Sequence, residues 1–600
     1  MWSLLCLVAA LVTHAAAYGV TTSLSAAANQ TFDYIIIGGG LTGITVAARL
    51  AENPSISVLV IEAGPDDRTN PQVYDIYQYG NFFNSRFNWN WPTEQGRTIA
   101  GGKTLGGGSS INGAAYTRGL NAQYDAWSTL LEPSEASAGW NWQGLWSYMK
   151  KSETFSPPNS QQAAKGAQFI DTYHGYNGPV QVTYPDRMYG GPQQPAFIET
   201  IMKLTGIKRY KDLNGGTPNC VSMTPVMMNW RDQGRRSSAP AAYLTPVESV
   251  RTGWTTLVGH MVTKINFSGS QIPLVATGVE FGASSKTGPR YRAYARKEVI
   301  LAAGAIQSPA LLQLSGIGDA AILGPLGIAT LVDLKTVGRN LQEQTMTTHG
   351  ASGNFDPQGS GPSNAIAFPN IYQLFGSAAN ATVQNIWNSL DAWAASQAGS
   401  GLSAGALKTI YEIQANLIIN NNAPVAELFF DTGWPDAAGI EIWPLLPFSR
   451  GNVKITSSDP FAKPAINVNY FSVDHDLKTQ IHGARLVRKL FGTSPLKDIL
   501  TGETSPGYSA VPDNNGNGGT DAAWTTWIRA NFGAVSHPVG TAAMMRRSLG
   551  GVVNAQLKVY DTTNLRVADA SIMPMQISAH LSSTLYGVAE KAADLIKAAQ

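Results

Sequence analysis

The hydrophobic and polar positions near the start of the chain predict a strand, a turn, a helix and a second strand. Residues 32–37, FDYIII, form an apolar run, and the glycines of GGGLTG follow at once. Apolar residues then recur at helical spacing as far as Leu50, and a second apolar run, SVLVIEAG, occupies residues 57–64. Elements in this order are typical of a βαβ unit in an α/β protein with a parallel sheet.

Three glycines in the first turn have the spacing of a dinucleotide-binding motif. Gly38 favours a tight turn, Gly40 lets a pyrophosphate approach the backbone, and Gly43 lets the helix pack close to the sheet. Glu62 ends the second strand at a position where a carboxylate accepts ribose hydroxyls and disfavours a 2′-phosphate. The sequence therefore predicts a dinucleotide other than NADP. A glycine-rich turn without a ligand is the alternative, and the turn alone does not separate NAD from FAD.

Two later segments carry a similar signal. Residues 101–119, GGKTLGGGSSINGAAYTRG, contain three consecutive glycines followed by serines and Asn112. Such a loop presents backbone N–H groups to a second face of a large ligand, and a flexible surface loop is the alternative. Residues 304–318, GAIQSPALLQLSGIG, follow the apolar run KEVILAAG. This order predicts another strand-to-helix turn close to the same sheet.

The two later segments resemble the two signature patterns of the glucose–methanol–choline (GMC) oxidoreductases. The resemblance runs from residue 32 to residue 600. It implies an α/β fold in which a discontinuous Rossmann-like domain binds FAD and an α+β domain with an antiparallel sheet binds substrate. The expected FAD-binding segments are residues 30–120, 230–340 and 545–600, and the expected substrate-binding segments are residues 121–229 and 341–544.

The same resemblance assigns residues to the cofactor. Val262 is expected near the adenine, and Asp569 and Ala570 near the pyrophosphate and ribityl chain. Some family members attach the flavin to a histidine near the glycine loop, but Asn112 stands in SSINGAAY instead, so non-covalent FAD is expected. The expected cofactor-binding residues are Gly38, Gly40, Gly43, Glu62, Gly107, Ser109, Asn112, Val262, Asp569 and Ala570.

Two histidines near the C-terminus are the candidate catalytic residues. Alcohol oxidation needs a base that takes the hydroxyl proton as hydride leaves for flavin N5, and histidine titrates near neutrality. His537 lies in AVSHPVGTAAMM and His580 in MQISAHLSSTLYG, two of only eight histidines. A lone histidine favours a core role, but this pair matches the catalytic pair of the family. The resemblance implies that His537 is the base and His580 orients the substrate hydroxyl, with a partial exchange of roles left open.

An acid and three aromatic residues complete the predicted site. Glu427, in APVAELFFDTG, resembles the acid behind the histidine pair of related enzymes, and its alternative is a surface carboxylate on a strand. Tyr79, Phe429 and Trp443 align with aromatics that line the sugar pocket of glucose oxidase-like members. Core packing is the commoner role of any one aromatic residue, but the set fits a platform for a pyranose ring.

The resemblance weakens where glucose-specific members place an arginine and an asparagine. Gly533 and Val535 occupy those positions. A site without these donors discriminates less sharply for glucose. The favoured hypothesis is oxidation of a sugar hydroxyl at C1 of glucose or a gluco-oligosaccharide to the lactone. Oxidation of an aryl or secondary-metabolite alcohol is the alternative, and a non-redox cyclase or lyase with structural FAD is a further one.

Composition limits the partners. Hydrophobic residues make up 44% of 600 residues, and 42 basic against 40 acidic residues leave a formal charge of +2. This balance argues against nucleic acid or an anionic membrane as the main partner. No haem module or carbohydrate-binding module is recognised, so electrons are expected to pass to oxygen or to a diffusible acceptor such as a quinone. Dehydrogenase activity is favoured over oxidase activity.

The first seventeen residues, MWSLLCLVAALVTHAAA, predict a secretory signal peptide because an apolar core ends in small residues. A secreted, extracellular protein is therefore expected. Cys6 would leave with the signal, and Cys220 would remain as a buried small residue rather than a nucleophile. Three sequons support the same location. The predicted glycosylation sites are Asn29, Asn266 and Asn380.

Overall fold

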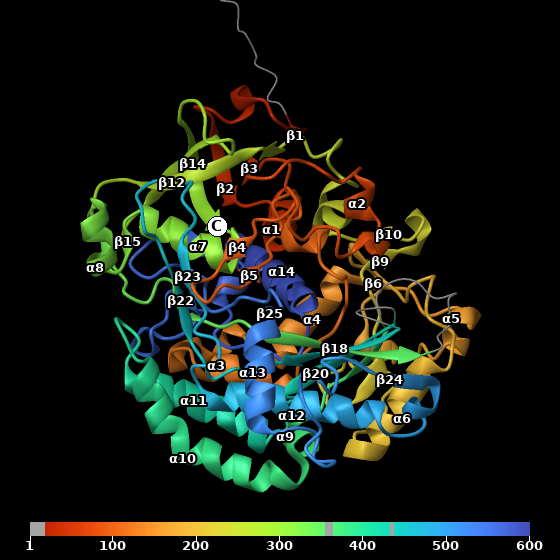
Figure 1. The fold of residues 1–600 in the computed structure, drawn as a ribbon. Coiled ribbons are helices and arrows are strands. Elements are labelled where there is room, and N and C mark those ends of the chain that lie inside the picture. The colour runs from red at the N-terminus through yellow and green to blue at the C-terminus, as the bar shows by residue number, and fades with distance from the viewer. Residues whose placement is uncertain (1–17, 354–363, 433–436, 600) are drawn as a thin grey trace, which may run out of the picture.

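Two β-sheets organise the chain, one in the upper and one in the lower half of Figure 1. The structure is a computed structural model that describes residues 18–353, 364–432 and 437–599. The predicted signal peptide, residues 1–17, lies outside the described residues.

The upper sheet contains eight strands within the described part of the chain. Strands β2, β3, β11 and β1 run parallel to one another, and β14 continues the parallel set on the other side of β2. Its strands are β1 (Gly19–Thr21), β11 (Trp254–Val258), β3 (Val58–Glu62), β2 (Thr31–Ile37), β14 (Tyr291–Leu301), β13 (Ala276–Ala283), β12 (His260–Phe267) and β26 (Leu565–Val567). The near-continuous apolar runs that predicted β2 and β3 are buried, as a parallel sheet requires.

The long strand β14 joins distant parts of the chain. Its first half pairs antiparallel with β13, and its second half lies between β2 and β26. Strands from residues 19–62, 254–301 and 565–567 therefore share one sheet, an arrangement that fits the predicted discontinuous domain. The predicted domain boundaries stay predictions.

Helices cover the upper sheet. Helix α1 (Leu41–Leu50) packs against α14 (Ser582–Ala598), which also contacts α4 (Trp142–Ser152). Figure 1 shows α14 deep in the molecule beside α4 and below α1. Helix α4 comes from the segment expected in the substrate-binding domain, so that segment also packs on the FAD-binding half. Helix α7 (Gly304–Leu314) begins where the third predicted turn lies.

The lower sheet is antiparallel, as the resemblance implied. Its strands within the described residues are β24 (Leu500–Ser505), β18 (Thr345–Gly353), β21 (Ala438–Pro444), β20 (Ala426–Thr432), β19 (Ala365–Ala367), β8 (Val221–Met223) and β25 (Gly533–Ala534). Helices α12 (Asp474–Phe491) and α6 (Gln193–Thr205) pack on it, and Phe197 of α6 stacks on Phe430. Phe429 points to the opposite face, because successive side chains alternate along a strand.

Further helices and short strands surround the two sheets (Figure 1). The further helices are α2 (Pro71–Tyr74), α3 (Asn121–Thr129), α5 (Ser160–Ala164), α8 (Ala320–Leu323), α9 (Ile371–Phe375), α10 (Ala379–Gln397), α11 (Ala404–Ile419) and α13 (Asp521–Asn531). The short strands are β4 (Trp91–Pro92), β5 (Thr98–Ile99), β6 (Glu153–Phe155), β7 (Val180–Val182), β9 (Met228–Asn229), β10 (Arg235–Arg236), β15 (Ile317–Gly318), β16 (Val332–Asp333), β17 (Arg339–Leu341), β22 (Gly451–Lys454) and β23 (Ala465–Asn467).

Several expectations concern single residues. Cys220 is fully buried, and burial raises the pKa of its thiol to about 12, which confirms a packing role rather than a nucleophilic one. Asn29 and Asn380 are exposed, whereas Asn266 is half-buried in β12. None of the helices in the described ranges combines the length and apolar character needed to cross a membrane.

Candidate active site

In the first glycine turn, backbone atoms lie so close to Gly38 and Gly43 that a side chain does not fit at either position. Gly38 has φ +100°, and a Cβ there would lie 2.6 Å from the carbonyl oxygen of Ala302. A Cβ on Gly43 would lie 2.0 Å from the carbonyl oxygen of Gly38. These positions therefore require glycine for the strand, the turn and the helix to meet as the sequence predicted.

The start of helix α1 fits a bound pyrophosphate. Gly40 is its N-cap and offers no side chain to the first N–H groups of a helix whose first turn is buried. A buried helix end without a cap accepts an anion well, because its free N–H groups and the helix dipole both favour negative charge. A Cβ on Gly40 would meet only one atom, at 4.0 Å, so space remains beside the turn.

The second glycine loop closes on the first. Gly40 and Gly106 form an isolated parallel bridge, and a Cβ on Gly107 would lie 3.0 Å from the Cα of Gly40. Ser109 donates its hydroxyl to the carbonyl of Gly106 and accepts the N–H of Ala239, so it fixes the loop. Two bare backbone segments thus lie side by side and form a cradle that suits FAD.

Glu62 supports the turn from within. Its Oε2 accepts the N–H of Gly39 at 2.7 Å and its Oε1 accepts the N–H of Gly64 at 2.7 Å. Burial raises the pKa of this carboxyl to about 7, although the backbone donors favour the charged form. Each oxygen keeps a second lone pair that is able to accept a ribose hydroxyl. The predicted contact with the ribose stays a prediction.

The remaining predicted cofactor residues surround the same region. Asp569 accepts the N–H of Gly304 at 2.9 Å and the hydroxyl of Ser308 at 2.5 Å, so it ties β26 to the start of α7. Val262 is buried in β12, and Ala570 follows Asp569 and is half-buried. Their predicted contacts with FAD stay predictions.

Asn112 lies at the end of the second loop and has neighbours on three sides. Its amide nitrogen donates to the hydroxyl of Ser582 at 3.2 Å, while its side-chain oxygen accepts from Arg236 at 2.8 Å and from the N–H of Ala114 at 3.1 Å. Asn112 therefore links the glycine loop to the N-terminus of α14. An amide cannot form the histidine-type covalent bond to flavin.

The structure brings the two predicted catalytic histidines together. The rings of His537 and His580 have their centroids 5.7 Å apart at an angle of 75°. His580 Nε2 lies 2.8 Å from Glu427 Oε1, and Glu427 is fully buried. Glu427 was predicted to be partly buried, and the structure shows that it is completely buried behind the histidine pair.

Backbone contacts hold the histidines from both halves of the molecule. Thr117, just after the second glycine loop, accepts the N–H of His580 through its hydroxyl at 2.8 Å. His537 donates its N–H to Glu343 at 2.9 Å, and Gln576 donates its side-chain amide to the carbonyl of His537 at 2.6 Å. Burial is the main cause, and the nearby His580 a smaller one, that lowers the pKa of His537 to about 3. His537 is therefore neutral at physiological pH.

Two of the three predicted aromatic residues form one surface beside the histidines. Phe429 and Trp443 stack with ring centroids 5.9 Å apart and only 3° between their planes. Trp443 also lies 5.0 Å from the ring of His580 and 5.9 Å from that of His537. Strand pairing of Glu427 with Trp443 places these side chains on one face of the lower sheet.

Tyr79 lies apart from this aromatic pair. It is 49% exposed, its ring packs edge-on against Phe83, and a Cβ on Gly113 would lie 3.6 Å from it. Within the described residues Phe429 and Trp443 stack on each other, and the predicted place of Tyr79 beside the substrate stays a prediction.

Sequence reasoning missed Glu441. Strand pairing sets it opposite Phe429 on β20, so both side chains lie on the sheet face that carries Trp443. The pKa of Glu441 is raised to about 8, mainly by burial and to a smaller extent by the charges of Asp431 and Glu427. An acid in an apolar strand, IEIW, was the available signal.

Sequence reasoning also missed Glu343 and Gln344. Glu343 accepts the N–H of Gln344 at 2.8 Å in addition to that of His537, and its Oε2 has no hydrogen-bond partner among the described residues. Burial raises the pKa of Glu343 to about 8. Glu343 and Tyr470 line a cavity of about 10 Å³, roughly the space for one water molecule.

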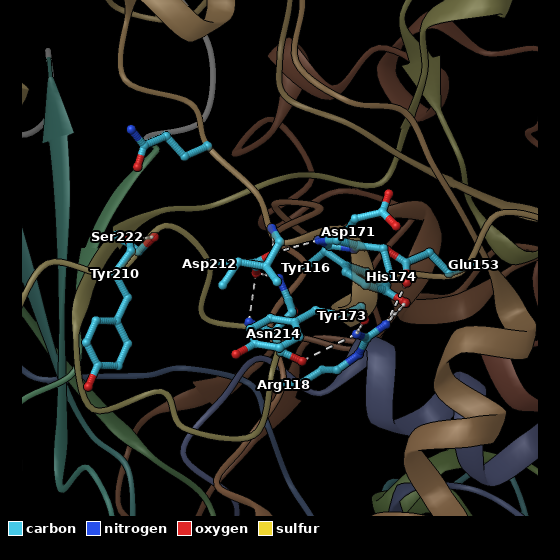
Figure 2. A network of polar contacts seen from close by, with 12 residues as sticks. Tyr116, Arg118, Glu153, Asp171, Tyr173, His174, Tyr210, Asp212, Asn214 and Ser222 are labelled. Atoms are coloured by element: carbon cyan, nitrogen blue, oxygen red, sulfur yellow. Dashed lines mark hydrogen bonds and ion pairs between the residues drawn. The ribbon is translucent and has the colours of Figure 1, made fainter.

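A buried charge network, also absent from the prediction, holds the segment behind His580 (Figure 2). Arg118 contacts Glu153 at 2.7 Å, and His174 lies between Glu153 at 2.7 Å and Asp212 at 2.8 Å. Arg118 also donates to the hydroxyl of Ser583 at 3.1 Å in the first turn of α14. These residues are far apart in sequence, so no local pattern pointed to them.

Comparison with known proteins agrees with this geometry. Family models described as GMC oxidoreductase match residues 32–346 and 447–589. A glucose oxidase of Aspergillus carbonarius (strain ITEM 5010) is 37% identical over 591 residues, which cover 96% of this chain and 94% of that protein.

Solved structures agree as well. An FAD-dependent oxidoreductase from Chaetomium thermophilum has a TM-score of 0.85 and 29% identity, over 95% of this chain and 99% of that one. A fungal aryl-alcohol oxidase has a TM-score of 0.82 and 28% identity, over 94% of this chain and 98% of that one. The chain therefore belongs to the GMC oxidoreductase family.

Proposed function

We propose that this protein is a secreted, FAD-dependent oxidoreductase that oxidises a sugar hydroxyl, at C1 of glucose or a gluco-oligosaccharide, to the lactone. The observation that carries the proposal is the stacked pair Phe429 and Trp443 beside the two histidines. A flat apolar surface next to a base suits the face of a pyranose ring.

Non-covalent FAD, when bound, accepts hydride from the substrate carbon at N5. The two glycine loops and the uncapped N-terminus of α1 would hold its pyrophosphate, and Glu62 would accept the ribose hydroxyls. Asn112 would lie on the flavin side, between the second loop and α14.

His537 acts as the base in this proposal. It is neutral because its pKa is lowered, so it is able to accept the proton of the substrate hydroxyl. His580 orients the same hydroxyl, because Glu427 engages its Nε2 and leaves Nδ1 available to the substrate. Glu427 thereby sets the ring orientation of His580.

The pocket supports a substrate larger than glucose. Gly533 and Val535 are half-buried, and a Cβ on Gly533 would meet only Met346, at 3.8 Å. The space that an arginine would fill is therefore available. Similarity to a glucose oxidase supports a sugar, whereas the aryl-alcohol oxidase neighbour supports the alternative of an aryl or secondary-metabolite alcohol. Electrons would pass to a quinone-type acceptor or to oxygen.

Anaerobic reduction of the flavin tests the proposal. Purified holoenzyme is mixed with glucose, cellobiose, laminaribiose or an aryl alcohol, and absorbance near 450 nm is followed before oxygen or a quinone is admitted. Rapid bleaching by glucosides supports the sugar, and the acceptor that restores absorbance separates oxidase from dehydrogenase. Bleaching by the aryl alcohol alone establishes the alternative, and bleaching by none supports a non-redox cyclase or lyase.

Secretion is tested separately. Expression of the full chain in a fungal host, followed by N-terminal sequencing of the protein in the medium, is expected to show cleavage between residues 15 and 18. Glycosidase treatment is expected to reduce the mass, with glycans at the exposed Asn29 and Asn380. Retention of the intact chain inside the cells would contradict the proposal.

A further inference from the structure

The side chain of Gln344 connects the imidazole of His537 to a backbone carbonyl. Gln344 Oε1 lies 2.9 Å from His537 Nδ1, and Gln344 Nε2 donates to the carbonyl oxygen of Leu445 at 3.0 Å. Gln344 is completely buried, so water does not compete for these contacts. Leu445 directly follows β21, whose pairing with β18 and β20 fixes its position.

The carbonyl of Leu445 determines which way the amide of Gln344 faces. A carbonyl oxygen only accepts hydrogen bonds, so the donor end of Gln344 must face Leu445 and its oxygen must face His537. An amide oxygen also only accepts, so Nδ1 of His537 must carry a proton. In a neutral imidazole the other nitrogen, Nε2, then has the free lone pair.

We propose that Gln344 is a positioning residue that fixes the tautomer of His537, so that Nε2 is always the nitrogen that accepts the substrate proton. The opposite tautomer would set two lone pairs against each other at Nδ1 and would leave a proton on Nε2. None of the hydrogen bonds among the described residues reaches Nε2, and His537 is only half-buried, so this nitrogen is available. The proposal rests on the proposed role of His537 as the base.

A neutral partner has a second consequence. A carboxylate at the same place would also orient the ring, but it would favour the imidazolium and raise the pKa by about one to three units. Gln344 orients the imidazole without adding charge. It therefore keeps His537 both correctly protonated and uncharged.

Three variants separate orientation from charge and from packing. Gln344→Leu removes the acceptor, Gln344→Glu keeps an acceptor and adds charge, and Gln342→Leu removes a neighbouring buried amide. Gln342 bonds the carbonyls of Asn340 and Pro574 and accepts the N–H of Gln576, and it does not touch the imidazole, so it is the control for the loss of a buried amide near His537. Flavin content and melting temperature are measured for each variant to confirm folding.

The rate of anaerobic flavin reduction is measured against pH for each variant. Gln344→Leu is expected to lose about 10–100-fold at every pH, in the range seen for residues that orient a functional imidazole. Gln344→Glu is expected to retain activity at high pH while the acid limb of its profile moves up by about one to three units. Equal losses in Gln344→Leu and Gln342→Leu, or an unmoved acid limb in Gln344→Glu, would overturn the proposal.

NMR of the ¹⁵N-histidine-labelled holoenzyme tests the tautomer without substrate. The wild type is expected to show a protonated Nδ1 and an unprotonated Nε2 for His537, assigned by the loss of these signals in His537→Asn. Gln344→Leu is expected to show exchange between tautomers. A protonated Nε2 in the wild type would overturn the proposal even if sugars reduce the flavin. An absence of reduction by any sugar would overturn the proposed function and leave this result intact.

Discussion

Two histidines in this molecule, His537 and His174, have opposite electrostatic surroundings. His537 faces a neutral amide, and burial lowers its pKa to about 3. His174 is more deeply buried, and burial by itself would lower its pKa, but hydrogen bonds to Asp212 and Glu153 raise it instead. The charge of the partner, rather than burial, therefore decides whether a buried histidine is a free base or a fixed cation.

The difference matches the place of each residue. His537 lies against Trp443 and His580, where the proposed mechanism takes a proton from the substrate hydroxyl. His174 lies in a line of alternating charges, Arg118, Glu153, His174 and Asp212 (Figure 2), and Arg118 also donates to Ser583 at the start of α14. A histidine whose charged form is favoured suits a structural network, and one whose neutral form is favoured suits a base.

The largest effect is expected at the neutral histidine. His537→Ala is expected to lower turnover by about 10²–10⁴-fold, because a positioned base contributes that much. FAD binding and the melting temperature are expected to stay close to the wild type, since His537 lies outside the glycine loops. Stopped-flow flavin reduction and the ratio of absorbance at 450 nm to 280 nm measure both. Unchanged turnover would remove His537 from the base role.

A large effect on stability is expected at the charged histidine. His174→Ala leaves two buried carboxylates with one cation, Arg118, so the free energy of unfolding is expected to fall by about 3–5 kcal/mol. His260→Ala is the control, because His260 is buried but its Nδ1 contacts only the carbonyl of Val258. Urea denaturation measures both variants. Equal losses would show that volume rather than charge explains the effect.

A smaller and pH-dependent effect is expected from Glu343, the buried acid beside His537. Its pKa is raised to about 8 in the folded protein against an ordinary 4.5. Between these values the folded protein holds a proton that the unfolded chain has lost, so stability falls as pH rises through that window. Glu343→Gln is expected to remove this fall, which is about 1.4 kcal/mol for each pH unit inside the window.

The pH profile also separates the two regions. Glu343→Gln should change the slope between pH 5 and 8 and keep most of the flavin reduction rate. The pKa of His174 is higher in the folded protein than in the unfolded chain. Its contribution to the free energy of unfolding is therefore complete below the unfolded pKa, about 6.5, and is lost as pH rises through the folded pKa. His174→Gln removes that loss. If the free energy of unfolding of Glu343→Gln changed with pH as steeply as that of the wild type, Glu343 would not be protonated in the folded protein.

The first βαβ unit and one later strand-to-helix turn follow from local patterns in the sequence. The apolar runs, the glycine spacing and the third turn predicted β2, α1, β3 and α7 within a few residues. A strand or turn of this kind depends on residues close together in the chain, so periodicity reveals it. The histidine pair was predicted by resemblance and lies together in the structure.

What the sequence alone determined is the family and the two-sheet architecture, and the chemistry at His537 and His580 stays a prediction. The tertiary structure alone decided which groups surround those histidines. Gln344, Glu343 and the Arg118 network come from segments between 118 and 344, whereas the histidines they hold lie beyond residue 536. The contact of Tyr79 with Phe83 and that of Phe429 with Trp443 were likewise decided by the tertiary structure. A partner's distance in space depends on how sheets and loops pack, and no local spacing encodes it.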